Sequence, residues 1–211
     1  TDRLPSNEII EKAIRKNITV YPNLAIRELV ANAIIHQDFS VKGSSPMIEV
    51  FSDRIEVTNP GIPLIDTLRF IDHSPESRNE KLANYMRKVG ICEERGSGID
   101  KVIHECEVYQ LPAPKFIVGD RFTRVILYSP KTLRKMDKED KIRACYQHCC
   151  LKYVTGDFMT NESLRERFGI DRKNYSTASR IISETIKAGF IKDYDPASSS
   201  KKFAKYIPIW A

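Results

Sequence analysis

The chain has 211 residues and a mass of 24.2 kDa, which is enough for one or two domains with buried cores. Hydrophobic residues make up 41% and charged residues 29%, a composition that excludes wholesale disorder. No apolar run approaches the roughly 20 residues of a membrane helix, and the amino-terminal segment has no apolar stretch like that of a signal peptide. The sequence does not begin with methionine, so we expect a piece of a longer protein.

The five cysteines predict a reducing, cytoplasmic location, because their number is odd and no C-x-x-C pair occurs. Cys145, Cys149 and Cys150 crowd one segment together with His148, a combination that would also suit a metal ion. No second ligand pair has usable spacing, however, and Cys145 and Cys149 recur at helical spacing. We therefore expect a buried apolar stripe on a helix and no metal at this segment.

The net charge of +6 is unevenly distributed along the chain. Residues 1–130 carry a net charge of −1, whereas residues 131–211 carry +7, with 17 Lys and Arg against 10 Asp and Glu. A concentration of positive charge in one domain is typical of proteins that bind the phosphate backbone of double-stranded DNA. A solvated basic face without a partner is the alternative that charge alone leaves open.

The first domain, residues 1–130, is predicted to be α+β, with helices against a mostly antiparallel sheet. Ser6 is the expected N-cap of the first helix. Helices are predicted over 6–17, 24–36, 79–89 and 99–109, from periodicity and from the glycines and prolines that end them. A β-hairpin is predicted over 47–58, with Ile48, Val50, Ile55 and Val57 on its inward face, and two further strands over 116–118 and 122–128.

The second domain, residues 131–211, is predicted to be a winged helix-turn-helix domain. Helices are expected over 137–153, 161–168 and 174–188, and strands over 190–193 and 203–209. Gly169 supplies the turn between the second and third helices. Three helices followed by a two-stranded ribbon is the order of elements in a winged helix.

The third helix of this domain begins with exposed hydrogen-bonding and basic side chains, which suit a recognition helix in the major groove. The predicted contacts on this helix are Arg172, Lys173, Asn174, Ser176, Thr177 and Arg180. The wing would bring Lys201, Lys202 and Lys205 to neighbouring phosphates. The alternative is a winged helix used for protein contacts or dimerisation.

The first domain contains an ordered set of residues that suits a nucleotide. Glu28 and Asn32 are spaced i, i+4 and therefore share one helix face. Downstream, a strand ends at residues 59–61 (Asn-Pro-Gly), and residues 96–98 (Gly-Ser-Gly) open a helix. A glycine turn at a helix N-terminus presents unpaired N–H groups to an anion.

This set resembles the GHKL ATPase superfamily of gyrase B, histidine kinases, mismatch-repair ATPases and heat-shock chaperones. The resemblance implies a GHKL-like α/β sandwich that binds ATP and magnesium. By the same resemblance Glu28 is the general base and Asn32 the magnesium ligand, within IRELVANAI. The adenine site would contain Asn59 and Gly61, and the phosphate turn Gly96, Ser97 and Gly98. The chain departs from the superfamily in having Asn59 where an aspartate is usual, followed by a single glycine.

More closely, the chain resembles a bacterial and archaeal family described as transcriptional regulators and related by name to the carboxyl-terminal part of the RecG helicase. The phrases that carry this resemblance are IRELVANAIIHQDFS (26–40), IEVFSDRIEVTNPGIP (48–63), SRNEKLANYMRKVGICEERGSGIDKV (77–102) and LPAPKF (111–116). Members commonly have a winged helix behind this domain. They often have a Schlafen-like AlbA domain ahead of it, which we expect in the full-length protein.

Three functions follow from these patterns. The first is a DNA-binding transcriptional regulator with a divergent nucleotide-binding sensor domain. The second is a nucleotide-gated homodimer that hydrolyses ATP weakly in DNA processing, and the third is a catalytically inactive oligomerisation module. A helicase motor is excluded within this chain because it has no P-loop. His36 and Asp38 either line the nucleotide site or cap the helix end and the turn before Gly43.

Overall fold

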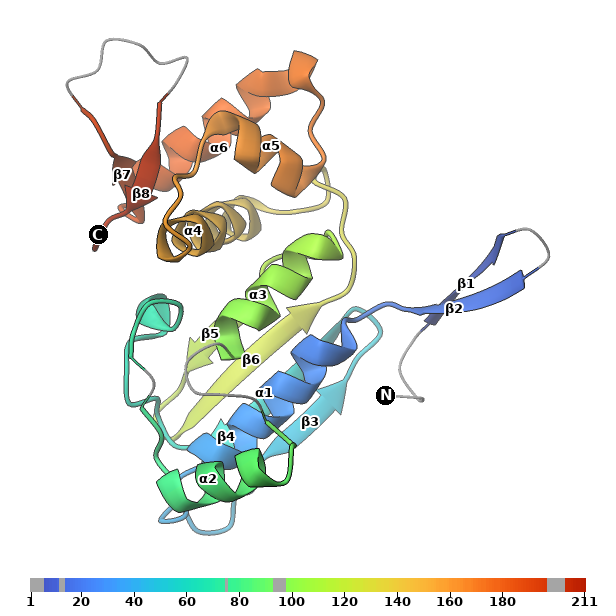
Figure 1. Ribbon diagram of the computed structural model, residues 1–211, viewed down its shortest axis with the longest axis vertical. Coiled ribbons are helices and arrows are strands. Elements are labelled where there is room, and N and C mark those ends of the chain that lie inside the picture. Colours follow the sequence, from blue (N-terminus) through green and yellow to red (C-terminus); the bar gives the residue numbers. More distant parts are fainter. Residues whose placement is uncertain (1–5, 12–13, 75, 93–97, 197–203) are drawn as a thin grey trace. The chain divides into compact units, whose positions relative to one another are not determined.

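The computed structural model describes residues 6–11, 14–74, 76–92, 98–196 and 204–211 (Figure 1). The chain divides into two compact units, Thr1–Pro130 and Lys131–Ala211, here called the first unit and the second unit. Four residues of the predicted sites, Gly96, Ser97, Lys201 and Lys202, lie outside the described residues. Within the described part of the chain, no helix has the length and apolar character needed to span a bilayer.

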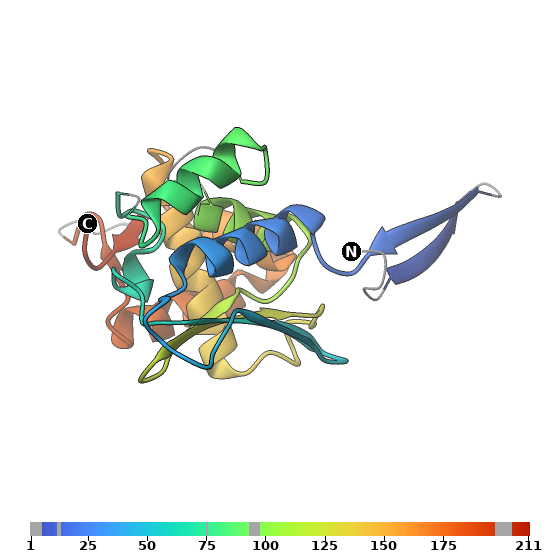
Figure 2. The ribbon, with the colours of Figure 1, turned by 90° about the horizontal axis from the view of Figure 1, so that it is seen from below.

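The first unit contains a four-stranded antiparallel sheet. The strands are β3 (Met47–Val50), β4 (Arg54–Pro60), β5 (Lys115–Val118) and β6 (Phe122–Tyr128), in the order β3-β4-β6-β5. The helices are α1 (Asn23–His36), α2 (Glu80–Lys88) and α3 (Gly98–Val108), with a short 3₁₀ turn, η1, at Thr67–Arg69. Figure 2 shows the three α-helices on one side of this sheet, with α2 farther from it than α1. The predicted α+β class is confirmed.

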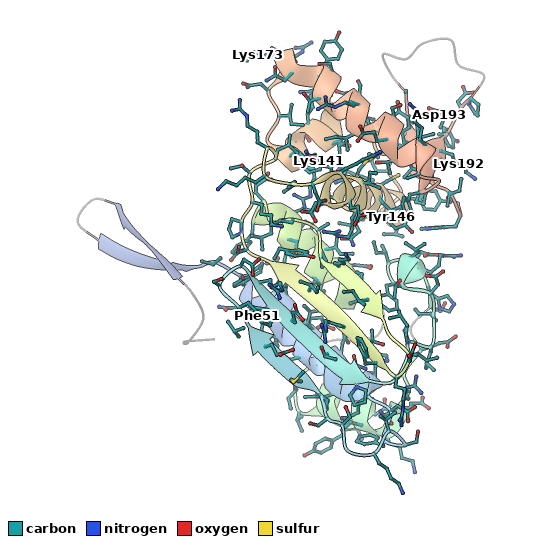
Figure 3. All side chains as sticks on the ribbon, turned by 180° about the vertical axis from the view of Figure 1, so that it is seen from behind. Phe51, Lys141, Tyr146, Lys173, Lys192 and Asp193 are labelled. Atoms are coloured by element: carbon teal, nitrogen blue, oxygen red, sulfur yellow. The ribbon has the colours of Figure 1, made fainter. Side chains whose placement is uncertain are left out.

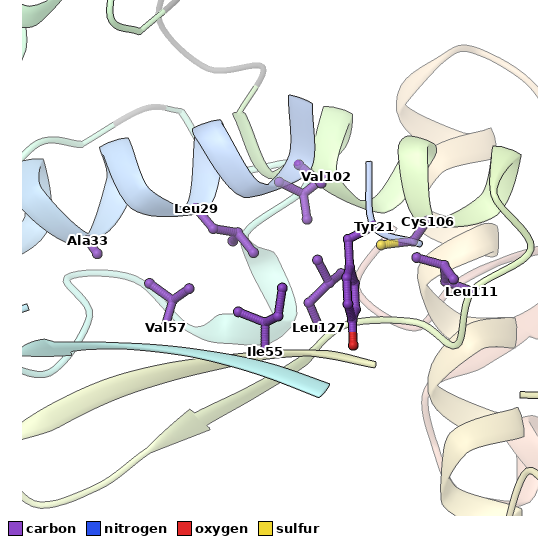
Figure 4. Packing of buried hydrophobic residues seen from close by; sticks show 10 residues of the cluster. Tyr21, Leu29, Ala33, Ile55, Val57, Val102, Cys106, Leu111 and Leu127 are labelled. Atoms are coloured by element: carbon purple, nitrogen blue, oxygen red, sulfur yellow. The ribbon is translucent and has the colours of Figure 1, made fainter. Parts of the chain in front are cut away.

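The core of the first unit lies between the sheet and the pair α1 and α3 (Figure 4). Leu29 and Ala33 of α1 pack in this core with Ile55 and Val57 of β4. A second, separate face of α1 packs against α2, through Ala31, Ile35, Ala83 and Met86. Because α1 is held on two sides, the face that carries Glu28 and Asn32 is placed precisely.

The predicted inward face of the first hairpin is half correct. Ile55 and Val57 are buried, but Ile48 and Val50 are 49% and 53% exposed. Their register pairs Ile48 with Val57 and Val50 with Ile55, so all four share one face of the sheet. The exposure arises because β3 is an edge strand and α1 packs over its neighbour β4.

The predicted helix over residues 6–17 is wrong. This segment forms β1 (Ser6–Glu11) and β2 (Ile14–Thr19), which pair with each other as an antiparallel hairpin. Ser6 therefore pairs with Thr19 in a strand and caps no helix. The segment is rich in isoleucine, whose branched Cβ lowers helix propensity and favours extended backbone.

The second unit consists of three helices and a two-stranded sheet in the predicted order. The elements are α4 (Lys138–Val154), α5 (Asn161–Phe168), the 3₁₀ turn η2 (Arg172–Asn174), α6 (Tyr175–Lys187), β7 (Ile191–Asp193) and β8 (Tyr206–Pro208). Thr160 begins α5 with a capping box to Ser163, and Gly169 ends it in the left-handed region at φ 61°. Local sequence signals thus account for both ends of α5.

Cys145, Cys149 and Cys150 lie on α4 and are fully buried in the core of the second unit. Burial raises the pKa of Cys145 to about 12, so its thiol stays protonated and behaves as an apolar group. His148 of the same segment bonds the hydroxyl of Ser163 at 3.1 Å. The cysteine stripe that the sequence predicts is therefore part of a packed core.

Candidate functional site

The first unit contains a pocket of about 500 Å³. Its walls come from α1, α2, the start of α3 and the irregular segment 62–78. Its floor is formed by residues of β4 and β6, including Val57, Asn59, Thr123 and Val125. The volume lies in the range usual for small-molecule and cofactor sites.

Glu28 and Asn32 both line this pocket from α1. The side chain of Glu28 is buried, and burial raises the pKa of its carboxyl group above the ordinary value. The charges of Lys101 and Arg27, and a hydrogen bond from Asn32, act in the opposite direction. A carboxylate with a raised pKa binds a proton more readily at neutral pH, which suits a general base.

Gly98 brings the start of α3 against this pair. A Cβ at Gly98 would lie 2.3 Å from Oε1 of Glu28 and 3.2 Å from Nδ2 of Asn32. A Cβ at this position would therefore force the carboxylate of Glu28 to move, since real Cβ atoms do not come within 3.0 Å of another heavy atom. The first N–H groups of a helix lack intrahelical partners, so the start of a helix such as α3 favours an anion.

Asn59 lies on the pocket floor and is 8% exposed. Its Nδ2 donates to the carbonyl oxygen of Pro60 at 3.3 Å. Its partner across the ladder is Thr123, which also lines the pocket and whose hydroxyl donates to the carbonyl of Gly61 at 2.8 Å. Thr123 is a site residue that no sequence motif indicates, because only strand pairing brings it beside Asn59.

Gly61 is not among the residues that line the pocket. It adopts φ +101°, and a Cβ there would lie 2.7 Å from Cβ of Asp38. The backbone of Asp38 donates to the carbonyl of Pro60 at 2.8 Å, so this glycine lets the chain after α1 approach the end of β4. Gly61 therefore permits a close backbone approach and is not part of the pocket lining.

The structure distinguishes the roles of His36 and Asp38. His36 lines the pocket, and burial first, with the charge of Arg78 second, lowers its pKa. Asp38 caps a turn, because its Oδ1 accepts from the backbone N–H and the hydroxyl of Ser40 at 2.9 and 2.7 Å. Arg78 also lines the pocket and lies 3.5 Å from Oδ2 of Asp38, although no spacing in the sequence connects it to α1.

The start of α6 in the second unit is a polar and basic surface. Most of the predicted contacts there are exposed: Arg172, Lys173, Asn174, Ser176 and Arg180. Thr177 is half-buried. Figure 3 shows Lys173 at one end of α6 and Lys192 and Asp193 near the other. Lys205 is exposed, and its Nζ lies 4.5 Å from the ring centroid of Phe158.

Asn161 connects α5 to the start of α6. Its Nδ2 donates to the carbonyl of Tyr175 and to the hydroxyl of Ser179, both at 3.0 Å. Nε of Arg165 donates to Oδ1 of Asn161 at 3.0 Å. These hydrogen bonds hold the basic end of α6 in a defined orientation.

Comparison with known proteins relates part of the first unit to a described family. Residues 43–127 match the family model described as "Putative ATP-dependent DNA helicase recG C-terminal". The match includes Asn59 and Gly98 of the site and supports the RecG-related, ATPase-like resemblance of this part of the chain. It ends before the second unit begins, so it does not bear on DNA binding. None of the curated proteins matches the chain.

A solved structure with a similar fold is that of the DIP2311 protein from Corynebacterium diphtheriae. The TM-score is 0.56 and the sequence identity 16% over 96% of this chain. The chain spans 42% of that protein's chain, so the two are comparable over less than half of the larger one. At this identity the similarity shows the fold alone.

Proposed function

We propose that this chain is a DNA-binding transcriptional regulator whose first unit binds a purine nucleotide with magnesium. The observation that carries the proposal is the convergence of Glu28, Asn32 and Gly98 in one pocket whose floor contains Asn59. These residues come from three separate elements, and each has the chemistry that the resemblance to GHKL ATPases implies. The match of residues 43–127 to the RecG carboxyl-terminal model supports the same class of domain.

The two sides of the pocket suit the two parts of a nucleotide. Val57 and Val125 give the floor an apolar surface for a flat heteroaromatic base, and Asn59 and Thr123 add a hydrogen-bonding edge beside them. The start of α3 at Gly98 offers N–H groups to phosphates. Asn59 retains an acceptor oxygen for an exocyclic amino group, as the usual aspartate would.

The donor set suits magnesium only when phosphates accompany it. Within the described ranges, no group of three His, Cys, Asp or Glu side chains is placed to hold a metal ion by itself. Magnesium usually takes one or two protein oxygens and completes its shell with phosphates and water. Asn32 would supply the protein oxygen, and the bound ion would neutralise phosphate charge.

We further propose that the second unit is a winged helix-turn-helix domain that binds double-stranded DNA. Three helices and a β7–β8 hairpin, the net charge of +7 and the exposed cations at the start of α6 support it. In this arrangement α6 enters the major groove and the hairpin reaches a neighbouring phosphate. A basic surface that contacts another protein is the competing use of this fold.

ATP hydrolysis is the second candidate function, and the position of Glu28 favours it. A buried carboxylate beside a helix N-terminus and a magnesium-binding amide has the placement needed to accept a proton from attacking water. Asn59 replaces the aspartate that is usual in the superfamily, but this replacement concerns the nucleobase and does not change the end of the pocket that contains Glu28. A domain that binds no nucleotide would instead serve as an oligomerisation module.

Titration calorimetry with ATP and magnesium tests the nucleotide function. We expect binding by the whole chain that weakens when the metal is chelated, because Asn32 holds the nucleotide through magnesium. Phosphate release in the same samples separates a sensor, which binds without turnover, from an ATPase. The absence of binding at millimolar ATP would refute the nucleotide function and leave the oligomerisation module.

The salt dependence of duplex binding tests the DNA function. Each phosphate contact releases about 0.9 counterion, so the affinity should fall steeply with salt. Replacing Lys201, Lys202 and Lys205 with alanine should reduce the slope of log K against log salt by up to about three units. A matched variant that removes the same charge from α4, with Lys138, Lys141 and Lys152 replaced, should leave the slope nearly unchanged. An affinity indifferent to salt would contradict the DNA function.

A further inference from the structure

The segment at residues 77–79 is anchored beside the pocket. Nδ2 of Asn79 donates to the carbonyl oxygens of Ile35 and Gln37, at 2.8 and 2.7 Å. These carbonyls belong to the end of α1, where the last carbonyl groups of a helix lack intrahelical partners. The two preceding residues, Ser77 and Arg78, line the pocket and are therefore held in place there.

Two polar atoms of this segment are buried without a hydrogen-bond partner among the described residues. They are Oγ of Ser77 and Nε of Arg78. The other nitrogens of Arg78 are engaged only in part, since Nη2 donates to the carbonyl of Ile62 at 2.5 Å and Nη1 lies 3.5 Å from Asp38. Buried donors without partners cost stability, so a ligand that supplied acceptors to both adjacent residues would be favoured.

The charge of Arg78 is only weakly compensated by its protein neighbours. Oδ2 of Asp38 lies at the long distance of 3.5 Å from Nη1 of Arg78, and Oδ1 of the same carboxylate accepts two hydrogen bonds from Ser40. His36 faces Arg78, and its lowered pKa keeps the imidazole neutral near pH 7. The Arg78 side chain is 22% exposed, so water screens its charge less than that of a surface arginine.

Other charged groups of the lining do not cancel this cation. Arg87 of α2 adds a second positive charge to the pocket wall. Glu76 and Glu80 also line the pocket, but both are exposed, and solvent screens exposed charges strongly. Glu28 lies with Asn32 against the start of α3. The segment at 77–78 thus offers donors and positive charge to an anion.

We propose that Ser77 and Arg78 bind a phosphate group of the pocket's ligand. The Ser77 hydroxyl donates one hydrogen bond, and the Arg78 guanidinium adds a charge-assisted hydrogen bond from Nε. The assignment rests on the proposed nucleotide function in one respect, which is that the phosphate belongs to a nucleotide. Ser77 and Arg78 open the phrase 77–102 that carries the resemblance to the RecG-related family, but the resemblance assigns neither residue a role in binding.

Binding of ATP, adenosine and tripolyphosphate to the whole chain tests this assignment. We expect Arg78→Gln to weaken the binding of ATP and of tripolyphosphate at least tenfold. The binding of adenosine should weaken by less than twofold, because adenosine has no phosphate. Ser77→Ala should show the same pattern with a smaller loss, and Arg78→Lys should retain part of the affinity. Arg121→Gln is the matched control, because Arg121 is exposed, is not part of the pocket lining and also acts on Asp38.

The outcomes separate this proposal from the proposed function. Equal losses of affinity for ATP and adenosine in the Arg78 and Ser77 variants would mean that the segment is structural. Unchanged affinities would mean that the phosphate lies elsewhere. Either result overturns the proposal. Wild type that binds tripolyphosphate in an Arg78-dependent way, but neither ATP nor adenosine, would support the anion site and refute the nucleotide function. If Arg78→Gln fails to fold, Ser77→Ala and Arg78→Lys carry the test.

Discussion

The contact between Gly98 and Glu28 gives the most direct test of the site's geometry, because it can be measured without any ligand. The perturbation is Gly98→Ala in two backgrounds, wild type and Glu28→Ala. In wild type the new Cβ would lie 2.3 Å from Oε1 of Glu28, so the carboxylate must move away. In the Glu28→Ala background that carboxylate is absent.

The expected size of the effect follows from three contributions. Alanine is better than glycine in a helix by up to about 1 kcal/mol, and less at the first helical residue. Forcing the Glu28 side chain off its rotamer costs about 0.5–1.5 kcal/mol. Losing its hydrogen bond with Asn32 costs about 1 kcal/mol more. Gly98→Ala should therefore destabilise the wild type by about 1 kcal/mol, and should be neutral or slightly stabilising in the Glu28→Ala background.

The assay must report the first unit alone. The single tryptophan, Trp210, belongs to the second unit, so its fluorescence is unsuitable. Cys106 is fully buried in α3, and its alkylation as a function of urea measures the unfolding of the first unit. Mass spectrometry of the Cys106 peptide distinguishes it from the half-buried Cys92.

The coupling between the two substitutions decides the outcome. We expect an interaction free energy of about 1–2 kcal/mol, typical of residues in direct contact. Equal effects of Gly98→Ala in both backgrounds, within about 0.3 kcal/mol, would show that Glu28 does not lie against the start of α3. That result would remove the geometric basis of the nucleotide site.

Three further substitutions or titrations examine the same pocket. If the chain hydrolyses ATP, Glu28→Gln should reduce phosphate release by about 10²–10⁴-fold at unchanged ATP affinity, and a robust rate in this variant would mean that the base lies elsewhere. Because burial raises the pKa of Glu28, the charged form of this side chain destabilises the fold. Glu28→Gln should therefore have a higher free energy of unfolding than wild type at pH 8, and this difference should disappear below pH 4.5. Asn32→Ala should abolish magnesium-dependent nucleotide binding and lower the free energy of unfolding by about 1 kcal/mol, because it removes the hydrogen bond with Glu28; a melted domain would make the residue structural. In an NMR titration the pKa of His36 should lie below 6.5 and should rise in Arg78→Gln. The neutral form of His36 should stabilise the fold above pH 6.5, and this contribution should be lost as the pH falls through the lowered pKa.

Much of the local structure follows from the sequence, because its signals are local. The i, i+4 spacing of Glu28 and Asn32 places them on one helix face whatever the rest of the chain does. The turn that the sequence predicts at Gly169 is confirmed, since this glycine ends α5 with a left-handed φ, and the structure places the N-cap of α5 at Thr160. The segment 6–17 shows the limit of this reasoning, since its polar and apolar residues suit a helix while its isoleucines form paired strands.

The composition of the pocket depends on tertiary structure. Asn59 and Thr123 become neighbours through the pairing of β4 with β6, and Arg78 meets Asp38 across 40 positions of sequence. Ile48 and Val50 have the pattern of core residues, yet they are exposed because β3 lies at the sheet edge. Periodicity predicts which residues share a face of one element. Only the packing of elements against each other determines which faces meet, because those contacts depend on strand order and on helix positions that no short segment encodes.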